Sequence, residues 1–209
     1  MARRGARDAR ADRRRARGAA GPGGRARHAG RVVTPRITPP AHFDDHQVEQ
    51  LDKTYPKPGG EYLNLWKTLA HRPELLRRVN ALGGYYPRHS VVGVRERELA
   101  ILRTAARRGA AYVEAQHRAI AADAGVPAAE IAAAADPALE HAWAPADAAL
   151  LAFVDEFVAH DTVGDATWSA LHAHLGDDGV LELLVMIGFY GLIGAMLSAV
   201  RVEIDAPAA

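Results

Sequence analysis

The stretch that decides the fold is VRERELAILRTAARRGAAYVEAQHRAIAADA, residues 94–124. Apolar side chains recur at three-to-four spacing on both sides of Gly109, which predicts two helices broken at this glycine. Glu98 lies near the start of the first helix and His117 in the middle of the second. If these helices pack antiparallel, their facing sides bring a carboxylate and an imidazole together. A carboxylate that holds an imidazole in one tautomer gives a group able to move protons near neutral pH.

Length and composition limit what the chain can be. Its 209 residues allow one well-cored domain and a tail. Residues 1–36 contain twelve Arg, no Lys and two acidic residues, whereas residues 37–209 carry 14 Lys and Arg against 23 Asp and Glu. The body is therefore acidic, and we expect no nucleic-acid binding by its surface. The chain has no cysteine, which excludes disulfides, thiolate zinc sites and thiol catalysis and fits a reducing cytoplasm.

The Arg-rich segment 1–36 is predicted to be a disordered tail, because it holds too little apolar surface to offset its ordering entropy. A basic arm for nucleic acid or acidic lipid is one interpretation. We favour an incidental tail, because the arginines are not interleaved with aromatic residues. The domain is then residues 37–209.

The rest of the domain has helical periodicity and no convincing alternation of period two, which predicts an all-α bundle of about seven to eight helices. Proline or aspartate marks several expected helix starts. Besides the central pair, helices are expected at 43–53, at 63–82 with a new start at Pro73, at 128–135, at 143–160, from a capping Asp165, and at 180–202.

The last of these helices holds an 18-residue run without charge, residues 183–200. That length is the lower limit for a membrane span. We favour a fully buried central helix of a soluble, cytoplasmic bundle, because no second span exists and glycines along the run allow close approach of neighbouring helices or subunits.

A family resemblance rests on the order of several motifs. They are RERELAILR at 95–103 followed by Gly109, Tyr112 and His117, then WAPADAALL at 143–151, DATW at 165–168 and GFY at 188–190. Together they resemble the carboxymuconolactone decarboxylase family over roughly residues 37–205. The resemblance implies the all-helical, alkyl-hydroperoxidase-like fold, a small-molecule substrate and a homo-oligomer, either a trimer or a hexamer.

The family has two chemical branches. The peroxidase branch needs a Cys pair, and the matching positions here are Ala110 and Val113, so the nucleophile for peroxide is missing. The lactone decarboxylases need no cofactor and no thiol. For that branch the resemblance implies that Glu98 orients His117, and that His117 transfers the proton when CO₂ leaves a carboxylated unsaturated lactone. The catalytic residues predicted on this basis are Glu98 and His117.

The remaining site predictions concern two tyrosines and the absence of a metal. Tyr86 and Tyr112 are predicted to bind substrate through their hydroxyls, although buried tyrosines more often serve only helix packing. No cofactor is expected, because the resemblance implies the branch that needs none. No metal site is expected either, because His172 and His174 point to different faces of a helix. A non-catalytic helical oligomer with the same fold is the alternative. A pocket holding Glu98 and His117 would favour the enzyme, and a filled interior around His117 would favour the scaffold.

Overall fold

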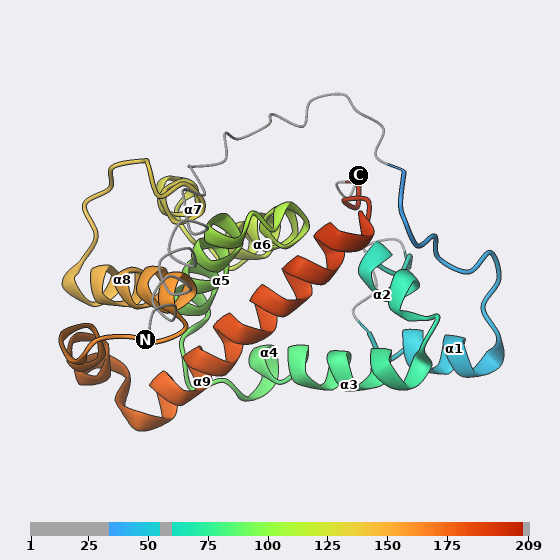
Figure 1. Cartoon of the computed structure of the whole chain (residues 1–209), viewed down its shortest axis with the longest axis horizontal. Coiled ribbons are helices and arrows are strands. Elements are labelled where there is room, and N and C mark those ends of the chain that lie inside the picture. The colour runs from blue at the N-terminus through green and yellow to red at the C-terminus, as the bar shows by residue number, and fades with distance from the viewer. Residues whose placement is uncertain (1–33, 55–59, 207–209) are drawn as a thin grey trace, which may run out of the picture. The chain divides into compact units, whose positions relative to one another are not determined.

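The computed structural model describes residues 34–54 and 60–206 (Figure 1). The predicted tail up to residue 33 and most of the predicted loop at 55–60 lie outside these residues. The described residues form helices and no sheet, which confirms the all-α prediction. The helices are α1 (Asp45–Leu51), α2 (Asn64–Leu69), α3 (Pro73–Gly83), α4 (Tyr86–His89), α5 (Val94–Arg108), α6 (Ala111–Asp123), α7 (Ala128–Ala135), α8 (Pro145–His160) and α9 (Asp165–Val200).

Helix α5 is the centre of the domain. It packs against α6, α7, α8 and α9, and Leu99 and Leu102 on it are fully buried. It ends at Gly109, which adopts a left-handed conformation (φ 64°), so the predicted break at this glycine is confirmed. Because α6 starts two residues later, it folds back along α5.

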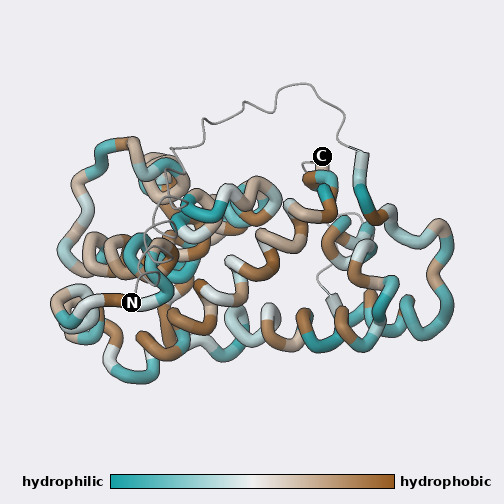
Figure 2. Tube along the Cα trace, in the orientation of Figure 1, coloured by the Kyte–Doolittle hydropathy of each residue, from teal (hydrophilic) through white to brown (hydrophobic). Residues whose placement is uncertain are grey.

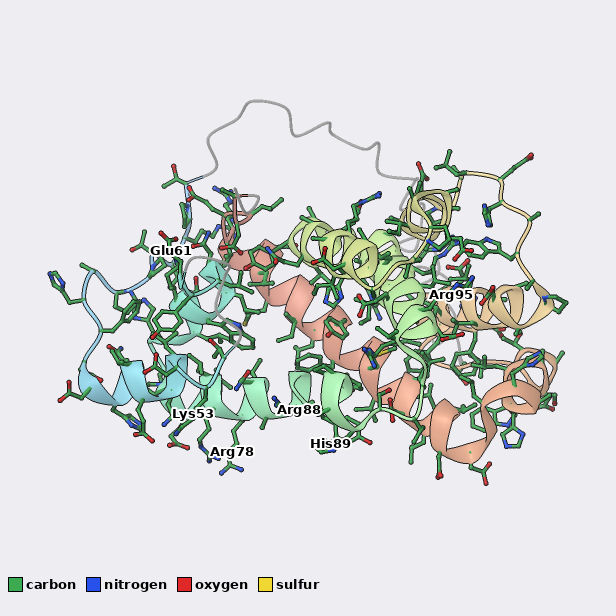
Figure 3. The ribbon with its side chains drawn as sticks, turned by 180° about the vertical axis from the view of Figure 1, so that it is seen from behind. Lys53, Glu61, Arg78, Arg88, His89 and Arg95 are labelled. Atoms are coloured by element: carbon green, nitrogen blue, oxygen red, sulfur yellow. The ribbon has the colours of Figure 1, made fainter. Side chains whose placement is uncertain are left out.

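Arg95 at the start of α5 ties two further helices to it. Its guanidinium donates two parallel hydrogen bonds, of 2.8 and 2.9 Å, to Asp147 of α8 and a third to Glu130 of α7. Figure 3 labels Arg95 among the side chains where these helices meet. Such a bidentate guanidinium–carboxylate contact fixes orientation as well as distance.

Helix α9 differs from its prediction in two respects. Its N-cap residue is Gly164, so Asp165 is the first helical residue and its side chain caps nothing. A non-helical Gly176 (φ 63°, ψ −172°) then divides the helix into two parts. The one-turn helix α4 is an addition to the predicted set, since four residues are too few to carry a periodic signal.

The expectation that the last helix is fully buried is wrong. In length and composition α9 could cross a membrane, but within this chain only 33% of its most apolar window is buried. One face packs on α5, α6 and α8. Apolar residues continue along the whole second part of the helix (Figure 2), and those on the opposite face are exposed to solvent.

Smaller helices complete the domain around a second apolar cluster. Leu51 of α1, Trp66 and Leu69 of α2 and Leu76 of α3 form its centre. The α1 helix begins with a capping box in which Asp44 and Gln47 bond each other's backbone N–H groups.

Candidate functional site

The centre of the candidate site is a hydrogen bond between Glu98 of α5 and His117 of α6. The Oε2 atom of Glu98 lies 2.7 Å from Nδ1 of His117. Glu98 is 3% exposed and His117 8% exposed, so both groups are almost out of water. The turn at Gly109 brings them together across 19 residues of chain, and the predicted pairing is therefore present in the structure.

This geometry assigns a role to each imidazole nitrogen. With Nδ1–H donating to the carboxylate, Nε2 carries the free lone pair. Within the described residues Nε2 has no hydrogen-bond partner. The Glu98–His117 couple can therefore act as a base. Nε2 accepts a proton, and the carboxylate of Glu98 stabilises the positive charge that results.

Tyr190 lies against the imidazole, and Tyr86 packs on Tyr190. The ring of Tyr190 on α9 stands edge-on to His117, with centroids 4.8 Å apart, and Tyr86 on α4 lies 6.2 Å from Tyr190. Burial, then the charge of Glu98, raises the pKa of Tyr190. Burial, then the charge of Glu182, raises the pKa of Tyr86 to about 12. Both phenols therefore stay protonated across the physiological range.

Tyr86 also carries an unsatisfied polar group. The residue is 2% exposed, and its buried hydroxyl has no hydrogen-bond partner among residues 34–54 and 60–206. A buried hydroxyl of this kind normally finds a partner, so this one is available to a bound molecule. Of the two tyrosines predicted to bind substrate, Tyr86 has the geometry for it.

Tyr112 points elsewhere. Its hydroxyl hydrogen-bonds the carboxylate of Asp205 and accepts the backbone N–H of Leu65 at 3.2 Å. Burial, then the bond to Asp205, raises its pKa. Its hydroxyl is thus already engaged in fastening the C-terminal segment to α6 and α2, and its predicted contact with substrate stays a prediction.

One cation lies beside the couple. Arg97, whose side chain is 12% exposed, donates from Nη1 to the carbonyl oxygen of Tyr86 at 3.1 Å, and its Nε is 3.9 Å from Oε1 of Glu98. Within the described residues, Nη2 has no hydrogen-bond partner. Sequence reasoning missed Arg97 because neighbouring positions on a helix face different directions, and only its long side chain reaches Glu98.

The positions of the redox cysteines in the peroxidase branch are filled with apolar side chains. Ala110 and Val113 are 2% and 4% exposed, and Gly194 of α9 packs directly on Ala110. Glu114, next to Val113, turns toward solvent and bonds Arg118 at 3.0 Å. It therefore does not join the couple.

Two hollows lie on the surface of the described residues. One, of about 560 Å³, lies along α8 beside Arg107. The other, of about 460 Å³, lies between α4 and α9 and is lined by Tyr85, Tyr86, Val91, Leu181, Glu182 and Val185, among others. We call the second the α4–α9 groove. Neither hollow is lined by Glu98 or His117, and Tyr86 and Tyr190 separate the groove from the imidazole.

Comparison with known proteins agrees with the sequence reading. Residues 73–156 match the sequence model of the Carboxymuconolactone decarboxylase family. A search of curated proteins finds no match. The match and the missing cysteines confirm the resemblance to a member of this family that lacks the redox Cys pair.

Solved structures share the fold. The alkylhydroperoxidase AhpD core protein of Ralstonia eutropha JMP134, an uncharacterized peroxidase-related protein, is 23% identical with a TM-score of 0.70, over 82% of this chain and 92% of that one. The debrominase Bmp8 is 17% identical with a TM-score of 0.69, over 81% and 92%. At these identities the likeness shows the alkyl-hydroperoxidase-like fold alone.

Proposed function

We propose that this chain, in which residues 73–156 match the carboxymuconolactone decarboxylase family, is a cofactor-free enzyme that transfers protons on a small unsaturated lactone or ring carboxylic acid. The observation that carries the proposal is the buried 2.7 Å hydrogen bond between Glu98 and His117. It presents Nε2 of the imidazole as the proton-transfer atom. A carboxy-lyase of the aromatic-catabolism type is the reaction class that we infer, acting in the cytoplasm.

The proposed reaction needs only one proton. When the carbon–carboxylate bond breaks, CO₂ leaves and its bonding pair passes into the ring as a dienolate. Protonated His117 then gives the Nε2 proton to the ring carbon, and Glu98 holds the imidazole in place through Nδ1. A proton from solvent then restores the imidazolium. Each turnover therefore converts the carboxylate and one solvent proton into CO₂ and the protonated ring.

Arg97 is proposed to stabilise the dienolate oxygen. Its guanidinium is nearly buried, lies beside Glu98 and keeps Nη2 without a partner among the described residues. A fixed cation aimed at charge that develops during the reaction lowers the barrier more than the same cation in water. Arg97→Lys keeps the charge but loses the planar fork, so we expect kcat to fall by about 10-fold or more.

The α4–α9 groove is the proposed route to the imidazole. It ends at Tyr86, whose ring lies against Tyr190, and Tyr190 touches His117. We propose that movement of both the Tyr86 and Tyr190 rings joins the groove to the imidazole and offers the Tyr86 hydroxyl to the substrate. The structural relative Bmp8, a debrominase, has a variant solved with 2,3,4-tribromopyrrole, and this supports a small ring as the substrate class here.

The decisive experiment follows loss of 4-carboxymuconolactone by ultraviolet absorbance, with wild type, His117→Ala and Glu98→Gln. We expect turnover in wild type and a loss of about 100-fold or more in His117→Ala, because the proton donor is gone. Glu98→Gln keeps the shape but removes the charge that stabilises the imidazolium, so a smaller loss is expected. Arg118→Ala, which changes the solvent-facing side of the same helix, is the control and should retain activity.

A non-catalytic scaffold is the second candidate function, and two observations favour it. Neither hollow reaches His117 in the single chain, and the positions of the redox cysteines are closed by Ala110 and Val113. Folded protein that turns over neither the lactone nor a panel of unsaturated ring acids would establish this alternative in place of the enzyme.

A further inference from the structure

The second part of α9 carries an exposed apolar surface that nothing in the described chain covers. Leu181, Val185 and Leu192 are 65%, 47% and 67% exposed, and small residues are exposed between and beyond them. Helices of soluble domains normally turn such residues inward. The exposed residues without a polar side chain, which we call the α9 stripe, are Leu181, Val185, Gly188, Leu192, Ala195 and Ala199, and the polar Ser198 is exposed beside the last of them.

The spacing of the α9 stripe is that of a helix pair. Successive members are separated by four, three, four, three and four residues. Alternate three and four spacing gives a repeat of 3.5 residues per turn, which keeps one seam facing a second helix when the two cross at a shallow angle.

The α9 stripe is also complementary to itself when reversed. When a second copy of the stripe runs antiparallel to the first about a two-fold axis near Tyr190, every member lies opposite another member. Large residues then face small ones. The pairs are Leu181 with Ala199, Val185 with Ala195, and Leu192 with Gly188. Large side chains set against alanine or glycine allow close packing between helices. The register therefore selects an antiparallel arrangement about a two-fold axis.

Charge agrees with this register. Asp178 lies just before the α9 stripe and Arg201 just after it, and both side chains are exposed. Within the described residues, neither forms a salt bridge. Reversal places Arg201 of one chain near Asp178 of the other. The α4–α9 groove beside Asp178 is also lined by Glu182 and, among the described residues, by no basic one. The basic residues Arg78, Arg88 and His89 lie along the outer edge of α3 and α4 (Figure 3).

From these observations we infer that the α9 stripe is the interface with a second copy of this chain, packed antiparallel about a two-fold axis near Tyr190. The second copy lies along the open side of the α4–α9 groove, because Leu181 and Val185 belong to both. Its Arg201 supplies the basic group that the acidic rim lacks. Each groove is then completed by the neighbouring chain.

Cysteine cross-linking tests the register directly, because the natural chain has no cysteine. We expect mild oxidation of the double variant Val185→Cys/Ala195→Cys to give a covalent dimer on a non-reducing gel. The two positions are ten residues apart on one helix, about 15 Å, so they cannot bond within a chain. The single variants Val185→Cys and Ala195→Cys are the controls and should stay monomeric on the gel, since each cysteine faces alanine or valine. Equal cross-linking of a single variant would overturn the antiparallel register.

Light scattering tests whether the contact exists in the unmodified protein. We expect wild type to contain at least two chains of 22.4 kDa per particle, and Leu192→Lys to reduce the mass by half or more. Ile120→Lys, an equally apolar and 44% exposed position on α6, is the matched control and should keep the wild-type mass. A monomeric wild type, including one that sediments with anionic lipid vesicles through α9, would contradict the inference. So would a wild-type mass in folded Leu192→Lys.

Discussion

At the scale of single residues, the least expected group is the Tyr86 hydroxyl. The sequence suggests the residue as a substrate contact, but only the structure shows that its oxygen is buried with no hydrogen-bond partner among the described residues. A polar atom left in this state costs free energy in the folded protein. Proteins tolerate such a cost where the group binds a ligand. A substitution that removes the hydroxyl can therefore change stability and activity in opposite directions.

Tyr86→Phe makes that separation measurable. We expect the free energy of unfolding to stay the same or rise by up to about 1 kcal/mol, because the substitution deletes an unsatisfied hydroxyl and keeps the ring. If the hydroxyl binds substrate, kcat/KM should fall about 10-fold in the same protein. Urea denaturation and steady-state kinetics measure the two effects. A clear loss of stability would show that the hydroxyl has a structural partner.

The raised tyrosine pKa values also predict alkaline instability. Burial raises the pKa of Tyr86 to about 12, and it raises those of Tyr112 and Tyr190 as well. Between pH 10 and pH 12 the unfolded chain therefore releases protons that the folded chain keeps, so stability declines as pH rises through this window. Below pH 10 these tyrosines do not change the free energy of unfolding as pH varies. Urea midpoints at pH 8, 10 and 11 test this, and Tyr86→Phe should flatten the decline.

At the scale of helices, sequence predicts what depends on local chemistry. The break at Gly109 and the new start at Pro73 follow from backbone preferences, and the Glu98–His117 pair follows from the turn between two helices. The capping role of Asp165 is wrong because Gly164 takes that position. The exposure of α9 is equally invisible in the sequence, because an apolar run looks the same whether it is covered by its own chain or by another.

Helix α9 approaches the start of α6 closely at Gly194. A Cβ atom there would overlap the Cβ of Ala110 at the start of α6. We expect Gly194→Ala to destabilise the fold by about 1–3 kcal/mol, despite the higher helix propensity of alanine. Gly191→Ala, where the nearest atom is 3.6 Å away, is the control and should stabilise by up to about 1 kcal/mol. Thermal melts measure both.

A compensating change checks the cause. Ala110→Gly in the Gly194→Ala background removes the overlapping methyl group, and it should restore most of the lost stability. No recovery in the double variant would mean that Gly194 is required by its own helix rather than by α6.

At the scale of the whole molecule, the carboxylate of Asp205 joins segments that are far apart in the sequence. It accepts hydrogen bonds from Tyr112, from Gln116 and from the backbone of Asn64. Asp205 is 8% exposed, so these donors lie in a nearly dry environment. Helices α2 and α6 and the C-terminal segment are thus fastened at one residue.

Asp205→Ala should therefore loosen the domain as a whole. We expect a loss of about 2–3 kcal/mol in the free energy of unfolding, since buried donors lose their acceptor. Glu203→Ala is the control, because the structure uses only the backbone carbonyl of Glu203, and it should change stability by less than about 0.5 kcal/mol. Urea denaturation of both variants measures the difference, and equal effects would contradict the assignment.

The two-fold contact also bears on the assembly that the family resemblance implies. A closed ring of three chains contains no two-fold axis, whereas a hexamer built from two such rings contains three. The inferred α9 interface is thus compatible with the expected hexamer and incompatible with the trimer. Mass measurements on wild type and Leu192→Lys distinguish the trimer from the hexamer. If wild type is a hexamer, Leu192→Lys should give trimers or single chains.

The domain also begins and ends at one place. The backbone N–H of Arg36 bonds the carbonyl of Val200 at 2.8 Å, and the Arg36 side chain bonds Ala199. A domain whose first and last described segments lie together can be circularly permuted: a short linker from residue 206 to residue 34, with new termini in the 136–144 segment, would keep every helix beside its present neighbours. In the antiparallel dimer the two meeting points lie at opposite ends of the paired α9 helices. Two cargoes fused to this domain would then be held a fixed distance apart, facing away from each other.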